Sequence, residues 1–86
     1  MPIEKDSVRK TLEYIKRREH TPDLNSFVAT VENGRAFVAY HNKKFCVTCY
    51  RWIGNTEETL EYQYDKIEDC HSKLLELKIK PETIEI

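Results

Sequence analysis

The chain has 86 residues, of which 40% are hydrophobic and 34% charged, with a formal net charge of -1 at pH 7. A chain of this length forms one domain, expected here over residues 1–86, and buries only about 60 to 65% of the surface of its unfolded state, so its core is thin. No apolar run reaches the length of a membrane span, and the first residues lack the apolar segment of a signal peptide. We therefore expect a cytoplasmic protein without membrane association.

The first predicted element is a helix that Asp6 or Ser7 can cap, because both side chains accept hydrogen bonds from free amides at a helix start. Its apolar side chains fall at spacings of four and three, which is typical of one buried helix stripe: Val8, Leu12 and Ile15. Pro22 disfavours a helical residue before it. We therefore expect the helix to end near residues 19–20.

An antiparallel meander is predicted next. Asn33-Gly34 stands between two alternating runs and is a favoured two-residue hairpin loop, because both central residues adopt positive φ. With this tip, Val31 pairs with Ala36. A second tight turn at Asn42-Lys43 brings a third strand alongside, and the alternation of residues 59–64 predicts a fourth.

A second helix follows, and Asp65 with Glu68 three residues later is typical of a capping box. Its expected buried stripe consists of Ile67, Cys70, Leu74 and Leu77. Pro81 is expected to stop this helix, and Ile84 and Ile86 indicate a short final strand or an arm over a sheet edge. The predicted fold is α+β: an N-terminal helix, a three- to four-stranded antiparallel meander and a C-terminal helix, with both helices on one face of the sheet.

The cysteines have the spacing of a metal site but not its geometry. Cys46 and Cys49 match a zinc knuckle in spacing, yet residues three apart in a strand point to opposite faces. Cys70 and His71 diverge by about 100° on a helix, so they do not converge on one ion. We expect no metal, no cofactor and reduced thiols, with Cys49 and Cys70 in the core and Cys46 on a sheet face.

Catalytic motifs are not suggested either. The two glycines, Gly34 and Gly54, stand alone in turns, so the sequence has neither a phosphate-cradling loop nor a nucleophile elbow. The histidines and carboxylates are scattered, and a thin core seldom encloses a pocket. We therefore predict that the protein is not an enzyme.

The predicted sheet side that faces away from the helices carries three aromatic residues, Phe37, Tyr50 and Trp52. Exposed aromatic patches mark interaction sites, and Trp, Tyr and Arg often dominate binding energy. We predict a protein-binding module, a small regulator, adaptor or inhibitor such as those that phages encode, whose partner is another protein or a second copy. The expected rim residues are Arg35, Lys44 and Arg51.

Charge leaves two alternatives open. Residues 1–56 contain ten Lys/Arg and six Asp/Glu, whereas residues 57–86 contain four and nine, and residues 33–56 contain no carboxylate. In the first alternative the aromatic sheet and the basic residues within 35–51 bind single-stranded RNA or DNA. The candidate phosphate contacts are then Lys43, Lys44, Arg51 and Arg17. In the second, the acidic run 57–69 imitates a nucleic-acid backbone and blocks a basic groove.

The order helix, three strands, helix also resembles the topology of double-stranded RNA-binding domains. That family has a glycine-flanked Lys-Lys cluster at the start of its last helix, where this chain reads YQYDKIEDC. Because these carboxylates would repel phosphate, the topology alone does not assign the chain to the family.

Overall fold

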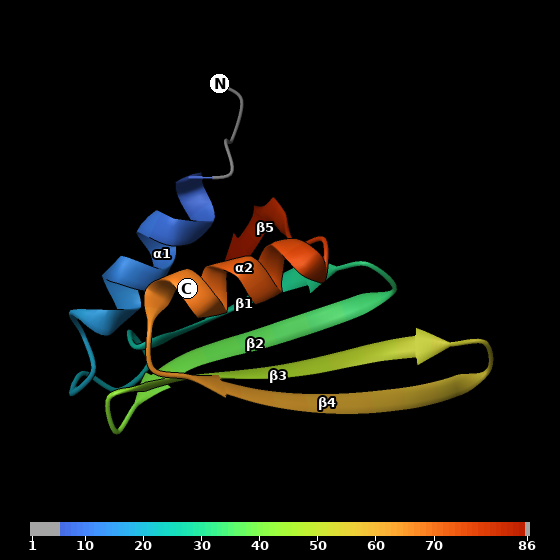
Figure 1. The fold of residues 1–86 in the computed structure, drawn as a ribbon, viewed down its shortest axis with the longest axis horizontal. Coiled ribbons are helices and arrows are strands. Elements are labelled where there is room, and N and C mark those ends of the chain that lie inside the picture. Colours follow the sequence, from blue (N-terminus) through green and yellow to red (C-terminus); the bar gives the residue numbers. More distant parts are fainter. Residues whose placement is uncertain (1–5, 86) are drawn as a thin grey trace.

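The computed structural model describes residues 6–85 and confirms the α+β prediction (Figure 1). The elements in chain order are α1 (Asp6–Lys16), β1 (Ser26–Val31), β2 (Gly34–His41), β3 (Lys44–Ile53), β4 (Thr56–Tyr64), α2 (Ile67–Glu76) and β5 (Lys80–Glu85). The sheet has five strands in the order β4-β3-β2-β1-β5, because the final segment pairs antiparallel with β1. The meander therefore has four strands, and the C-terminal strand extends the sheet at its far edge.

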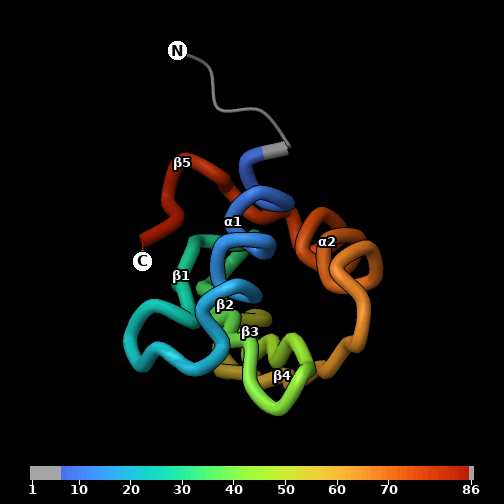
Figure 2. Tube along the Cα trace, turned by 90° about the vertical axis from the view of Figure 1, so that its left-hand side faces the viewer, coloured from blue at the N-terminus to red at the C-terminus, as the bar shows by residue number. Residues whose placement is uncertain are grey.

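The molecule has two layers, with α1 and α2 side by side on one face of the sheet (Figure 2). The predicted stripe of α1 forms part of the core, since Val8, Leu12 and Ile15 are fully buried. Alternate residues of β1, β2 and β3 face this stripe and are buried as well. They are Phe27, Ala29, Val31, Ala36, Val38, Tyr40, Phe45, Val47 and Cys49.

The tip of the β1–β2 hairpin differs from the prediction by one residue. The two loop residues are Glu32 and Asn33, and Val31 pairs with Gly34, so the register is shifted by two positions. Only Asn33 has positive φ here, at 63°. Gly34 is instead needed for close approach, because a Cβ atom on it would overlap the carbonyl oxygen of Tyr50 on β3. A shift of two positions leaves every side chain on its predicted face.

The β2–β3 turn agrees with the prediction. Asn42 and Lys43 both have positive φ, 52° and 63°, as a type I′ turn requires. Val38 pairs with Val47 across this hairpin, as expected.

The end of α1 differs from the prediction, since α1 ends at Lys16 rather than near residues 19–20. The amide of Arg18 donates to the carbonyl of Ile15 (3.1 Å), a three-residue spacing that tightens the last turn and closes the helix. Ser7 lies inside α1 and is not its cap. The side chain of Asp6, the other predicted cap, lies outside the described part of the chain, as does Ile86.

Both ends of α2 also differ from the prediction. Its N-cap is Lys66 and no side chain caps it, so the predicted capping box at Asp65 is wrong. The carboxylate of Asp65 lies 3.8 Å from the ammonium of Lys44 instead. At the other end, Lys78 has positive φ (60°) and the amide of Ile79 donates to the carbonyl of Leu74 (3.1 Å). This Schellman arrangement ends the helix before Pro81.

Candidate functional site

The sheet face turned away from the helices, called the open face below, carries the three predicted aromatic residues. Phe37, Tyr50 and Trp52 are 44%, 47% and 57% exposed, whereas their chain neighbours Val38 and Cys49 are buried. Strand alternation explains this contrast, because β2 and β3 turn every second side chain toward the helices. The prediction that these aromatic side chains lie on the uncovered side is confirmed.

Strand pairing places Phe37 at the centre of the open face. One row of paired residues crosses all five strands: Glu85, Val28, Phe37, Thr48 and Glu61. In the neighbouring row Tyr50 pairs with Arg35. Phe37 and Tyr50 therefore occupy diagonal positions on adjacent strands, a separation that aromatic side chains can bridge.

The open face is hollowed around Phe37. A hollow of about 690 Å³, called the Phe37 hollow below, has Phe37, Tyr50, Arg35, Val28, Asp23 and Glu85 among its lining residues. A second hollow of about 530 Å³ adjoins it, and Asp23, Ser26 and Phe37 line both. Sequence reasoning missed Asp23, Glu85 and Val28, since they reach this surface through a loop and through the β1–β5 pairing.

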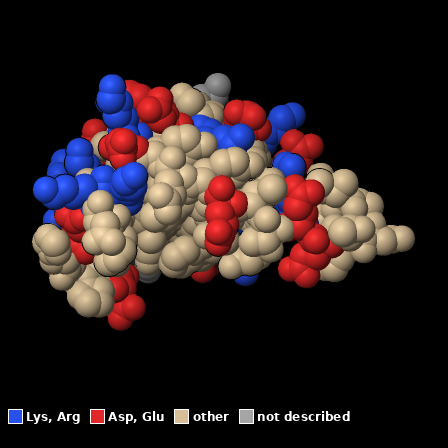
Figure 3. All heavy atoms as spheres, turned by 60° about the horizontal axis from the view of Figure 1, so that its bottom comes forward, with Lys and Arg blue, Asp and Glu red and all other residues tan. Residues whose placement is uncertain are grey.

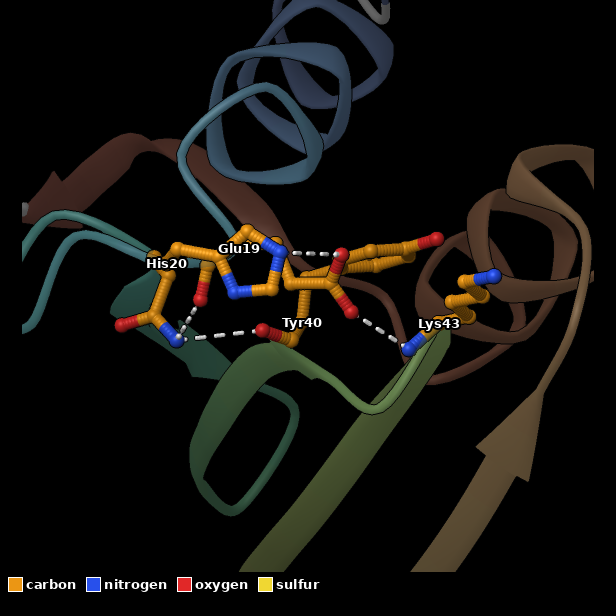
Figure 4. A network of polar contacts seen from close by, with 5 residues as sticks. Glu19, His20, Tyr40 and Lys43 are labelled. Carbon is orange, nitrogen blue, oxygen red and sulfur yellow. Dashed lines mark hydrogen bonds and ion pairs between the residues drawn. The ribbon is translucent and has the colours of Figure 1, made fainter.

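Residues 17–25, which follow α1, form one wall of the two hollows and are fastened to the sheet. The carboxylate of Glu19 accepts a hydrogen bond from the backbone amide of Lys43 (2.6 Å), and its other oxygen lies 3.6 Å from Nε2 of His20 (Figure 4). The side-chain amide of Asn25 donates to the carbonyls of Tyr40 (3.0 Å) and Glu19 (3.4 Å). These contacts hold the wall in place without a ligand.

Asp23 is positioned by a tight turn in that wall. The amide of Leu24 donates to the carbonyl of Thr21 (3.2 Å), Pro22 stands at the second position, and Asp23 has φ of 69° at the third. This is the pattern of a type II turn, and Asp tolerates the left-handed conformation better than most residues.

The predicted basic residues are not gathered around the aromatic side chains. The prediction that Arg51 lies at the rim of the aromatic surface is corrected, because Arg51 shares the helix side of β3 with Cys49. Its guanidinium lies 3.6 Å from the carboxylate of Glu58. Lys44 is on the open side of β3 but at the far end, paired with Asp65. Figure 3 shows a group of basic side chains at the end of the molecule opposite the β3–β4 hairpin and acidic side chains toward both ends. Arg35 is therefore the predicted cation that lines the Phe37 hollow.

The remaining candidates lie apart from the hollow. Lys43 is in the β2–β3 turn and Arg17 follows α1, both exposed. Trp52 lies near the end of the β3–β4 hairpin, which extends beyond α2 (Figure 1), and its amide donates to the carbonyl of Asn33 (2.9 Å). Ile53, which sequence reasoning missed, is 50% exposed on the opposite side of that hairpin because the helices do not reach so far.

The three cysteines are free thiols at separate places in the fold. Cys46 is half-buried on the open face, and Cys49 is buried on the helix side of β3, as the strand alternation predicts. Cys70 is buried in α2, as its expected helix stripe predicts. Burial raises the pKa of Cys70 to about 12, with a smaller contribution from Cys46. Burial also raises the pKa of Cys49. Within residues 6–85, no three His, Cys, Asp or Glu side chains are placed to share a metal ion.

No protein-family model, curated protein or solved structure matches the chain. Neither helix in the described range 6–85 combines the length and the apolar run that crossing a membrane requires. Function is therefore inferred from the open face itself.

Proposed function

We propose that this chain is a cytoplasmic, non-enzymatic protein-binding module, a small regulator, adaptor or inhibitor, whose partner occupies the open face. The observation that carries the proposal is the exposure of Phe37, Tyr50 and Trp52 on a sheet side that no described element covers. Water contact over such rings is unfavourable, and exposed aromatic clusters are typical of binding surfaces.

The energy available from these rings is substantial but limited. An aromatic side chain presents about 150 to 250 Å², and each of the three retains about half of its surface. At about 25 cal/mol per Å², covering all three contributes on the order of 6 to 9 kcal/mol. Association itself costs on the order of 4 to 15 kcal/mol. Specific binding therefore requires the polar rim as well as the rings.

The shape of the face favours a partner that inserts a side chain. The Phe37 hollow lies beside a wall that Glu19 and Asn25 hold in place through hydrogen bonds to Lys43 and Tyr40. A surface that is already ordered loses less conformational entropy when a partner binds.

The nucleic-acid alternatives have less support. Two of the four candidate phosphate contacts, Lys44 and Arg51, already pair with carboxylates. Glu61 and Glu85 end the row that contains Phe37, and carboxylates beside a stacking surface repel phosphate. The acidic run 57–69 is divided between faces, and three of its members pair with cations: Glu58, Asp65 and Glu68.

Affinity capture with matched variants tests the proposal. The immobilised wild type is compared with the double variant Phe37→Ala/Tyr50→Ala and with Leu75→Ala, an exposed apolar residue on α2 away from the open face. We expect a protein that the wild type and Leu75→Ala retain and that the double variant loses at least tenfold, with circular dichroism unchanged. Equal retention by all three, or retention only of material that nuclease removes, would overturn the proposal.

Self-association is tested on the same samples. If the partner is a second copy, analytical ultracentrifugation shows a wild-type dimer that Phe37→Ala/Tyr50→Ala dissociates and Leu75→Ala does not. A dimer that survives the double variant would place the contact elsewhere and contradict the role of the open face.

A further inference from the structure

Two carboxylates line the Phe37 hollow and have no cationic partner within residues 6–85. Asp23 enters from the type II turn of the wall, and Glu85 enters from β5, directly opposite Val28. Both residues are exposed. Neither belongs to any ion pair among residues 6–85. Their charge is therefore available to a partner.

The charge of the hollow is negative on balance. Arg35, in the row of Tyr50, is the basic residue in its lining, so two carboxylates stand against one guanidinium. The adjoining hollow adds Glu19, and the described residues that line it include neither lysine nor arginine. A concave surface whose lining carries a net negative charge attracts positively charged groups.

The aromatic residues between these charges favour the same kind of ligand. Phe37 and Tyr50 present ring surface in the hollow that Asp23 and Glu85 border. The face of an aromatic ring attracts a cation, most often a guanidinium. Lysine and arginine also have apolar stems that cover hydrophobic surface while the charged end stays hydrated. Ring and carboxylate together therefore suit a long basic side chain.

From these observations we infer that the partner presents a basic segment, whose lysine or arginine side chain lies against Phe37 and Tyr50 and reaches Asp23 and Glu85. This inference rests on the proposed function and names the chemistry of the partner. The same charges disfavour the phosphates of a nucleic acid at this face.

Fluorescence anisotropy with defined probes tests the inference. The probes are a labelled Gly-Ser peptide with interspersed arginines, the same peptide with citrulline at those positions, an oligoglutamate peptide and single-stranded oligothymidylate. We expect the arginine peptide to bind, the neutral citrulline peptide to bind at least about tenfold more weakly, and the affinity for arginine to fall with added salt. Equal binding of the citrulline peptide, or preferential binding of oligoglutamate or oligothymidylate, would overturn the inference.

Variants assign the effect to the hollow. Asp23→Asn/Glu85→Gln preserves side-chain shape and removes both charges, and it is expected to weaken arginine-peptide binding about tenfold. Phe37→Ala is expected to weaken it about fivefold. Glu82→Gln is the matched control, because Glu82 is also exposed on β5 but lines neither hollow, and it should bind like the wild type. Loss of binding in Glu82→Gln equal to that in the double variant would show an unspecific charge effect and refute the assignment.

The protein-binding function and the basic chemistry of the partner can be tested separately. In one outcome, the captured protein is lost by Phe37→Ala/Tyr50→Ala but is retained by Asp23→Asn/Glu85→Gln at high and low salt. This outcome would refute the basic partner and leave the protein-binding function in place. Capture that neither double variant reduces would refute both. Capture that both reduce supports both.

Discussion

The carboxylate of Glu19 accepts a hydrogen bond from the backbone amide of Lys43, 2.6 Å away, and so ties the segment after α1 to the turn between β2 and β3 (Figure 4). The Glu19 side chain is 17% exposed, whereas Lys43 in the turn is exposed to solvent. Glu19→Ala is expected to lower the free energy of unfolding by about 1 to 2 kcal/mol. Because the wall of the hollows then loosens, binding at the open face should weaken as well.

Urea denaturation measures the stability change, and Glu19→Gln is the matched control. Glutamine keeps an acceptor oxygen and a similar shape, so it should lose less than half as much stability as alanine. If both variants unfold at the wild-type midpoint, the hydrogen bond does not fasten the wall.

Trp52→Ala is expected to leave the fold intact and to reduce partner binding. The ring is 57% exposed on the protruding β3–β4 hairpin, so its removal should change the free energy of unfolding by less than about 1 kcal/mol. As an exposed tryptophan on the proposed binding surface, it should contribute about 2 kcal/mol or more to binding. Val47→Ala on the same strand is the contrast, because Val47 is buried and its truncation leaves a cavity.

Thermal and urea unfolding of both variants, together with the capture assay, test this contrast. A Trp52→Ala protein less stable than Val47→Ala would mean that the indole is part of the core. A stable Trp52→Ala protein with full partner retention would remove Trp52 from the binding surface.

The two glycines are expected to resist substitution for different reasons. Gly34→Ala introduces a Cβ atom into the backbone of β3 at Tyr50 and Arg51, so it should cost about 2 kcal/mol or more. Gly54 has open space around it but φ of 63°, so Gly54→Ala should cost about 1 kcal/mol from backbone strain alone.

Asparagine distinguishes these mechanisms, because it tolerates positive φ but adds bulk. In urea denaturation, Gly54→Asn should be closer to the wild type than Gly54→Ala, whereas Gly34→Asn should be at least as destabilised as Gly34→Ala. A tolerated Gly34→Asn would contradict the close approach of β2 and β3 at this position.

Stability is expected to fall in alkaline solution. Burial raises the pKa of the Cys70 thiol from 9.0 to about 12. Above pH 9 the unfolded chain therefore releases a proton that the folded chain retains, and deprotonation favours unfolding. The free energy of unfolding should decrease by about 1.4 kcal/mol per pH unit for this group between about pH 9 and 12. Burial also raises the pKa values of Cys49, Tyr40 and Tyr64, which act in the same direction.

Urea midpoints measured across this pH range for the wild type and Cys70→Ala test the expectation. The variant lacks the Cys70 proton, so its stability should depend less steeply on pH, whatever its stability at neutral pH. Equal slopes would show that Cys70 titrates alike in both states.

Much of the fold follows from local patterns. The alternation in β2 and β3 predicted that Phe37 and Tyr50 face away from the helices, because side chains in a strand change sides at every residue. The same period assigns Arg51 to the helix side with Cys49, and its expected place beside the aromatic residues was wrong for that reason. The positive φ that Asn42 tolerates predicted the β2–β3 turn and its register.

Other features depend on contacts between distant parts of the chain. The β1–β2 register departs from the local preference of Asn33-Gly34, because Gly34 must pack against Tyr50 on a third strand. Asp65 pairs with Lys44 rather than capping α2. A local sequence motif reflects only interactions between residues close together in the chain. It therefore does not show that a partner on a distant strand competes for the same side chain.

The sequence by itself determined the strand and helix pattern and which side of each strand is apolar, since periodicity and turn chemistry act over a few residues. The tertiary structure alone decided that Asp23 and Glu85 border the same hollow as Phe37. The pairing of β5 with β1 brings Glu85 there, and the bond from the Lys43 amide to Glu19 holds the wall that carries Asp23. Both are contacts between residues far apart in the chain, whose closeness depends on the packed sheet.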